Sequence, residues 1–211
     1  MSQTPPIDSL ETSANQPYHH GNLRLALINA SVDIIRAQGV AGLSLRKLAD
    51  AVGVSRTAPY HHFKDKDALL AAVASEGFSV LHKLLDQVSI EPNDPLNKIL
   101  ERSVMDYLNF AIKHPTEYEL MFGAALWQDK QQAEFQRTAK DCFRQYVILF
   151  EKLQSSSKIN TQESPLRLAQ ITWATLHGLA RLASDGVFAQ KEDIHSIAQT
   201  AISQLVITLR V

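Results

Sequence analysis

The chain lacks the features by which many enzymes and secreted proteins are identified. It has one cysteine, Cys142, so it cannot form an internal disulfide, which suits a reducing cytoplasm. It has no glycine-rich phosphate loop, no Gly-x-Ser-x-Gly motif and no His, Cys and Glu set at metal-ligand spacing. The pairs His19-His20 and His61-His62 are adjacent, and neighbours on a helix point in different directions. We therefore expect no enzyme, no metal and no cofactor.

Long apolar runs are also missing. No run approaches the roughly 18 apolar residues that span a membrane. Residues 2–17 are polar and contain proline, with neither the cationic start nor the apolar stretch of a signal peptide. We expect a cytoplasmic protein with no membrane partner, in which residues 1–17 form a disordered tail.

The net charge of -1 is unevenly distributed. Residues 18–66 carry seven Lys and Arg against three Asp, a net charge of +4, whereas residues 67–211 carry 14 Lys and Arg against 17 Asp and Glu, a net charge of -3. A basic first quarter on an acidic body indicates a polyanionic partner at one end.

The hydrophobic pattern has helical spacing throughout, and no segment alternates as a strand would. The expected fold is all-α with about nine helices, an N-terminal domain over 18–66 and a C-terminal domain over 67–211. Capping residues, glycines and prolines set the expected boundaries. The predicted helices are 22–38, 45–52, 56–63, 66–88, 95–114, 116–122, 135–154, 165–185 and 192–210.

The segment Leu45–Phe63 has the parts of a helix-turn-helix. Ser44 is placed to cap a short helix, Gly53-Val54 breaks the chain, and Ser55 is placed to cap a recognition helix over Arg56–Phe63. Such helix pairs also occur as plain structure in all-α proteins, so spacing alone leaves DNA binding open.

In a helix-turn-helix, the N-terminal residues of the second helix reach base edges in the major groove. Arg56 is the candidate for a bidentate guanine contact, and Thr57 can touch a thymine methyl or a phosphate. Tyr60, His61 and Lys66 suit phosphate contacts, which position the protein without reading sequence. The predicted DNA-contacting residues are Ser44, Arg46, Ser55, Arg56, Thr57, Tyr60, His61, His62 and Lys66.

Residues 22–66 resemble the N-terminal domain of the TetR family of transcriptional regulators. The run "ALINASVDIIRAQGVAGLSLRKLADAVGVSRTAPYHHFKDKDALL" carries the match, including the family's Tyr-x-His-Phe ending and the following Lys, here Tyr60, His62, Phe63 and Lys66. Pro59 departs from the leucine of many members and is expected to alter the pitch of the recognition helix. The runs "YHHGNLR" and "TWATLHGLARL" resemble a subgroup with a C-terminal Trp…His-Gly motif.

The resemblance implies a C-terminal domain that dimerises and often binds a small molecule. Leu166–Ala183 is apolar nearly all round, and the last helix carries an apolar stripe from Ile194 to Leu209. These helices, about 165–185 and 192–210, could form a four-helix seam with a second copy, or could simply fill the core of one chain. The implied function is a repressor that binds a palindromic double-stranded DNA operator as a homodimer.

A small-molecule effector would release that repressor from DNA. The predicted pocket residues are Phe110, Tyr118, Met121, Phe122, Trp127, Phe143, Trp173 and His177. Such an aromatic set can equally be plain core, and His177 beside Gly178 can be a buried hydrogen-bonding residue. A ligand-independent regulator and an all-α protein-interaction adaptor are the alternative functions.

Overall fold

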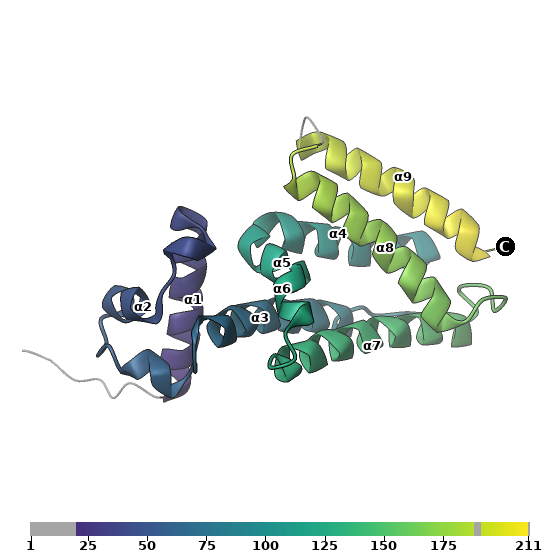
Figure 1. Cartoon of the computed structure of the whole chain (residues 1–211). Coiled ribbons are helices and arrows are strands. Elements are labelled where there is room, and N and C mark those ends of the chain that lie inside the picture. The colour runs from purple at the N-terminus through teal and green to yellow at the C-terminus, as the bar shows by residue number, and fades with distance from the viewer. Residues whose placement is uncertain (1–19, 188–190, 211) are drawn as a thin grey trace, which may run out of the picture.

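The structure is a computed structural model that describes residues 20–187 and 191–210 of the chain, so the predicted tail lies outside the described residues. Within these ranges the fold is all-α, as predicted, with nine α-helices, two short 3-10 helices and no strand (Figure 1). The elements are α1 (His20–Gln38), η1 (Val40–Gly42), α2 (Leu45–Val52), η2 (Ala58–His61), α3 (Lys66–Asp86), α4 (Leu96–Lys113), α5 (Pro115–Phe122), α6 (Ala124–Gln128), α7 (Ala133–Ser155), α8 (Pro165–Ser184) and α9 (Lys191–Arg210).

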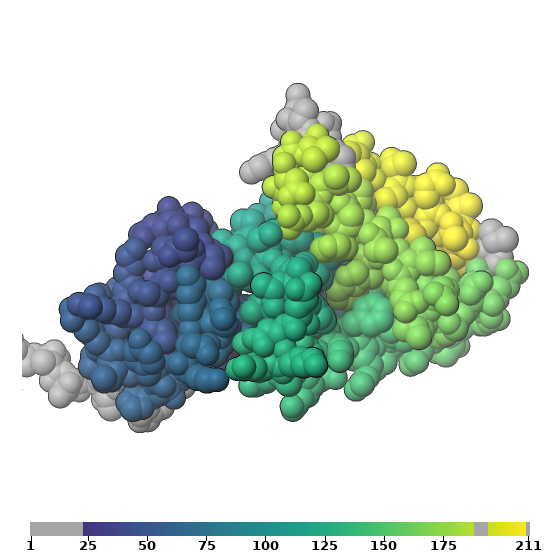
Figure 2. Space-filling model, viewed as in Figure 1, coloured from purple at the N-terminus to yellow at the C-terminus, as the bar shows by residue number. Residues whose placement is uncertain are grey.

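The N-terminal elements α1, η1, α2 and η2 form a small lobe at one end of the molecule (Figure 2). Its core includes Leu27, Leu48 and Phe63, all buried. The Arg24 guanidinium lies over the Phe63 ring, 5.6 Å from its centroid, and pairs with Glu76 of α3 at 3.7 Å. The burial of these apolar side chains holds the helix-turn-helix elements α2 and η2 against α1 and the start of α3.

The helix α3 connects this lobe to the body and runs through its centre, packed against α5 and α7 (Figure 1). It is the one described helix that is long and apolar enough to cross a membrane, but half of its apolar window is buried inside the protein. Gly77 allows a close approach to α5, because a Cβ there would lie 2.4 Å from Sδ of Met121. Helices α4, α8 and α9 cover the other side, with α9 packed against α4.

Outside the helix-turn-helix, each predicted helix boundary lies within two residues of the observed one. The first helix begins at His20, before Asn22, and Pro95 is the N-cap of α4 and not its first residue. The sequence pattern also missed α6, a single turn that follows Gly123. Only five residues long, α6 has too few positions to show a helical period.

Candidate nucleic-acid interface and ligand cleft

The first helix of the predicted pair forms as expected. The Ser44 Oγ atom accepts a hydrogen bond from the Lys47 backbone N–H at 3.2 Å, which caps α2. Gly53 follows the helix with a left-handed φ of 75°, and the Val54 N–H donates to the Ala49 carbonyl at 3.0 Å. Because a side chain at Gly53 would strain this conformation, the glycine sets the turn between the two helices.

The second element differs from the predicted α-helix over Arg56–Phe63. Only Ala58–His61 is helical, as the 3-10 helix η2, and Ser55 does not cap it. Pro59 explains the change, because it has no N–H to donate to the Ser55 carbonyl as an α-helix requires. Shorter bonds form instead, from the Ala58 N–H to the Ser55 carbonyl at 3.0 Å and from the Tyr60 N–H to the Thr57 carbonyl at 3.1 Å.

Most of the predicted DNA-contacting side chains lie on the outside of the lobe. Tyr60 is 57% exposed, and Arg46, Thr57 and His61 are also exposed. The Arg56 guanidinium is exposed too and makes a loose ion pair with Asp50 of α2, 3.7 Å between Nε and Oδ1. These side chains give the turn and η2 an outward surface of hydrogen-bond donors beside a positive charge.

Other predicted contacts already have partners within the chain. The Ser55 and Thr57 hydroxyls lie 3.2 Å apart, and His62 is half-buried beside Phe63. The Lys66 Nζ atom donates to the Val40 carbonyl at 2.6 Å, which ties α3 to η1. A phosphate contact by Lys66 remains a prediction, one that would share the ammonium group with this internal bond.

Two exposed lysines extend the basic surface beyond the predicted set. Lys47 lies on α2, where its Nζ donates to Oε1 of Gln38 at 2.7 Å. Lys64 follows η2, and its Nζ donates to Oε1 of Gln131 in the body at 3.2 Å. Both could have been selected from the sequence by charge and position, since Lys47 adjoins the predicted contact Arg46 and Lys64 lies between the predicted contacts His62 and Lys66.

A cleft of about 330 Å³ opens between α6, α7 and α8. In Figure 2 the flanking helices, α6 in teal and α8 in green, lie on the same face of the molecule. Five of the eight predicted pocket residues line this cleft, namely Phe122, Trp127, Phe143, Trp173 and His177, together with residues that the prediction did not include. The missed residues are Phe78, Ala139, Gln170 and Ala174.

The other three predicted pocket residues, Phe110, Tyr118 and Met121, are buried in the packing between helices and do not line the cleft. Met121 fills the space left by Gly77, and the Phe110 ring stacks on His114 with 5.1 Å between centroids. Their aromatic or apolar character could not distinguish core from lining, because both environments favour the same side chains.

A chain of hydrogen bonds runs from the core to the cleft. The Tyr107 and Tyr118 hydroxyls lie 3.1 Å apart, and the Tyr118 hydroxyl lies 2.7 Å from Nδ1 of His177. Burial, and then the positive charge of Arg181, lower the pKa of His177, which favours its neutral form. Arg181 itself bonds to the carboxylates of Glu119 and Asp185, so its charge is balanced beside the cleft.

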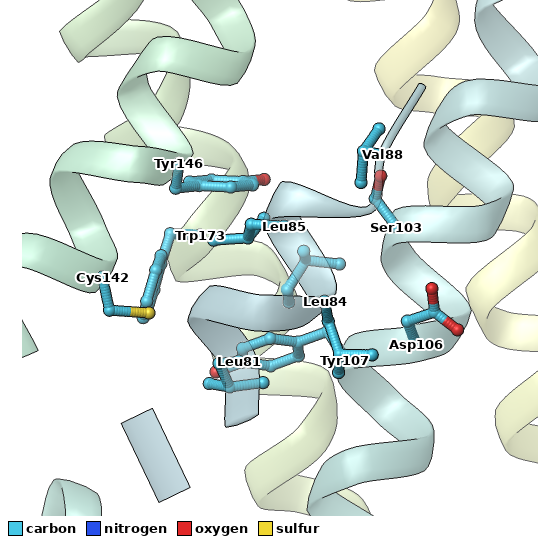
Figure 3. Close-up of a pocket in the computed structure, with 11 residues that line it drawn as sticks. Leu81, Leu84, Leu85, Val88, Ser103, Asp106, Tyr107, Cys142, Tyr146 and Trp173 are labelled. Atoms are coloured by element: carbon cyan, nitrogen blue, oxygen red, sulfur yellow. The ribbon is translucent and has the colours of Figure 1, made fainter. Parts of the chain in front are cut away.

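A second, much smaller cavity of about 30 Å³ lies behind the cleft, between α3, α4, α7 and α8. Figure 3 shows the rings of Tyr107, Tyr146 and Trp173 around it, with Cys142 and Asp106 at opposite ends. It has room for about one water molecule. Trp173 lines both spaces and is the wall between them. Burial raises the pKa of the Cys142 thiol to about 12, which disfavours the reactive thiolate.

A capped helix, a glycine turn and an outward basic surface on an all-α body together define a helix-turn-helix regulator. The profile described as "Bacterial regulatory proteins, tetR family" matches residues 27–73. The profile described as "Tetracyclin repressor-like, C-terminal domain" matches residues 100–205. The chain belongs to the TetR family of transcriptional regulators.

Similar proteins support this assignment, one over a short segment and two over most of the chain. The chain is 48% identical over 48 residues to the tetracycline repressor protein class A from transposon 1721 of Escherichia coli, covering 23% of this chain and 22% of the repressor. It is 26% identical over 169 residues to the uncharacterized HTH-type transcriptional regulator YobS of Bacillus subtilis (strain 168), covering 80% and 82%. A solved protein of unknown function from Rhodococcus sp. RHA1 has a TM-score of 0.80 at 29% identity, covering 93% of this chain and 100% of that one.

The alignment with the tetracycline repressor thus spans less than a quarter of that protein. The family assignment makes the chain a DNA-binding transcriptional regulator and points away from an enzyme.

Proposed function

We propose that the protein is a repressor that binds a palindromic operator as a homodimer and leaves it when a small molecule enters the cleft. The observation that carries the proposal is the outward placement of Arg56, Thr57 and Tyr60 on the N-terminal lobe. The body attached to this lobe has an outer face, over residues 168–180 and 194–209, without charged side chains. Such a protein acts in the cytoplasm, where the DNA is.

The outer face of α8 supports dimerisation. Ile171 is 53% exposed and Leu182 is 40% exposed, although both are large and apolar. Gly178 lies on the same stripe, and a Cβ there would meet no atom within 4 Å. Residues 168–180 contain no charged side chain. An exposed apolar stripe with a glycine suits close packing against the same helix of a second copy.

The apolar stripe of the last helix takes the second of the two roles that the sequence left open, which is to fill the core of one chain. This stripe, with Ile194, Ala198 and Ile202, is buried within the chain, where α9 packs on α4 and α8. The exposed side of α9 is nevertheless uncharged from residue 194 to residue 209 and includes Ile207, which is 60% exposed. Because depletion of charge characterises the core of an interface, this side supports a seam formed by both helices.

A contact path from the cleft to the DNA-binding lobe supports release by a ligand. Trp127 lines the cleft, and its carbonyl accepts a hydrogen bond from Nε2 of Gln136 at 3.2 Å. The loop between them carries Gln131, which bonds to Lys64 just beyond η2. A ligand that moves Trp127 can therefore shift the lobe and change the separation of two recognition segments, which motifs of this kind hold about 34–36 Å apart.

Selection of genomic fragments by the purified protein tests the proposal. We expect one palindromic site to be recovered, with affinity that falls steeply as salt rises. Binding to all fragments alike would contradict it and favour the protein-interaction adaptor. Repression of the adjacent promoter that no cell extract relieves would favour the ligand-independent regulator.

A further inference from the structure

The cleft has a definite chemistry. Five of its side chains are aromatic, namely Phe78, Phe122, Trp127, Phe143 and Trp173, and none of its lining residues is Asp, Glu, Lys or Arg. Its volume of about 330 Å³ lies at the small end of the range for ligand pockets, about 300–1,000 Å³. Flat aromatic walls without a counterion favour a flat apolar guest, since burying an unpaired charge is costly.

The polar handle of the cleft is His177, and the hydrogen-bond chain fixes its tautomer. Tyr107 is buried, and its hydroxyl has Tyr118 as its hydrogen-bond partner within the described residues. If Tyr107 donates to Tyr118, and Tyr118 donates to Nδ1 of His177, every proton of the chain has an acceptor. The reverse direction leaves the Tyr107 proton without an acceptor among the described residues, which is unfavourable for a buried hydroxyl.

In the favoured direction Nδ1 of His177 is an acceptor, so Nε2 carries the proton. No described residue accepts a hydrogen bond from Nε2. The cleft therefore contains a donor of fixed position, Nε2 of His177, among aromatic walls, and the Gln170 amide is a second polar group in the lining. The lowered pKa of His177 agrees with this neutral form, in which the ring cannot attract an anion as an imidazolium would.

We propose that the cleft binds a neutral, planar aromatic molecule of one or two rings whose carbonyl-type oxygen accepts a hydrogen bond from Nε2 of His177. This inference rests on the proposed function, because it names the chemical class of the effector. A charged guest of either sign is disfavoured, because no residue that lines the cleft is Asp, Glu, Lys or Arg and the charge would be buried without a partner.

The cleft and the proposed dimer seam use different stripes of α8. Gln170, Ala174 and His177 line the cleft, whereas Ile171, Gly178 and Leu182 lie on the exposed apolar stripe. The cleft residues are spaced by four and three residues and the stripe residues by seven and four, so each set follows one side of the helix. The two sides are displaced by one residue, which is about 100° around a helix. A second copy on the apolar stripe would thus leave the cleft free for a ligand.

Matched probes test the inference on the full-length protein by titration calorimetry. The first pair is 2-acetylnaphthalene and 2-isopropenylnaphthalene, which differ only by O in place of CH₂. We expect the ketone to bind about five- to tenfold more tightly, the worth of one net hydrogen bond. The charged pair, 2-naphthoate and trimethyl(2-naphthyl)ammonium, should bind more weakly than the ketone. Equal binding of the ketone and the alkene, or tighter binding of a charged probe, would overturn the proposal.

Two variants locate the site. His177→Phe should bring the ketone and the alkene within about twofold of each other, because it removes one hydrogen-bond donor. The control His82→Phe makes the same change on α3, outside the cleft, and should keep the preference. Ala174→Trp should abolish binding of both probes by filling the cleft, while its thermal unfolding stays that of the wild type. Retained binding in Ala174→Trp would contradict the assigned site.

Operator binding separates this inference from the proposed function. If the protein selects an operator but binds none of the aromatic probes, the effector class is wrong and the regulator stands. If it binds the ketone but selects no DNA, the proposed function fails while the binding site stands. Ketone binding that leaves operator affinity unchanged would refute the role of this guest as an effector.

Discussion

The surface around η2 and the outer face of α8 and α9 differ in what they offer to a partner. The first presents Arg46, Arg56, Tyr60 and His61 to solvent around a short helical turn. The second has no charged side chain over residues 168–180 and 194–209. The first surface suits a polyanion, whose binding depends on charge and therefore on salt, and the second suits another protein surface, whose binding buries apolar area. The DNA-binding surface and the proposed dimer seam thus differ in their driving forces.

The largest effect we expect concerns stability, which the body supplies. Phe150 of α7 is 1% exposed and packs edge-on against Tyr146, with 5.3 Å between ring centroids. Phe150→Ala should lower the free energy of unfolding by about 3–5 kcal/mol, because it leaves a cavity. Urea unfolding followed by circular dichroism measures this. As a control, Leu25→Ala on the N-terminal lobe should cost no more than about 0.5 kcal/mol, since Leu25 is 48% exposed. Equal losses would show that the core is misplaced.

The next effect concerns the dimer seam. Ile171→Arg places a charge on the exposed apolar stripe of α8 and should leave a folded monomer. Operator affinity should then fall on the order of 100-fold, because the second half-site is no longer bound intramolecularly. Sedimentation and a gel-shift titration measure the two changes. Val80→Arg, on α3 and 37% exposed, is the matched control. A dimeric Ile171→Arg protein would place the seam elsewhere.

A smaller effect concerns reading of the bases. Arg56→Ala should relax preference at one position of each half-site by about 1–3 kcal/mol, as expected when a bidentate guanine contact is lost. Selection from a randomised operator library measures it. Arg36 is a suitable control, because it lies at the end of α1 in an exposed ion pair with Asp33. Arg36→Ala should keep the base preference, and an unchanged preference in Arg56→Ala would remove Arg56 from the reading residues.

The smallest effect concerns pH. In the folded protein the pKa of His177 is lowered from 6.5, so the unfolded chain takes up this proton first as the pH falls. The free energy of unfolding should therefore decrease as the pH drops below about 6.5 and level off below the folded pKa. Urea unfolding at several pH values, compared between wild type and His177→Phe, isolates the contribution. Identical pH profiles would contradict it.

Local signals in the sequence were sufficient for most of the fold. The Ser44 cap, the left-handed Gly53 and the proline at the start of α8 each act within a few residues, so their effects can be predicted without the tertiary structure. The same holds for the outward position of Arg56. The 3-10 form of η2 was only partly foreseen, since Pro59 predicted an altered pitch but not the loss of the α-helix.

The ligand cleft depends on contacts that no local pattern contains. Tyr118 and His177 are 59 positions apart, and their hydrogen bond exists only because α5 and α8 pack together. Met121 entered the core because Gly77, on another helix, leaves room for it. Gln170 is a polar residue on an apolar helix, and only the three-dimensional arrangement shows that it faces the cleft.

Pro59 also affects how an operator should be deduced for this protein. In a 3-10 helix, residues three apart lie directly above one another, whereas in an α-helix they are displaced by about 60° around the axis. Thr57 and Tyr60, joined by such a bond, therefore lie on the same side of the recognition segment. If both side chains contact the DNA as proposed, a recognition code based on an α-helix would assign them to the wrong neighbouring positions. The specificity of this regulator must accordingly be measured on its own operator.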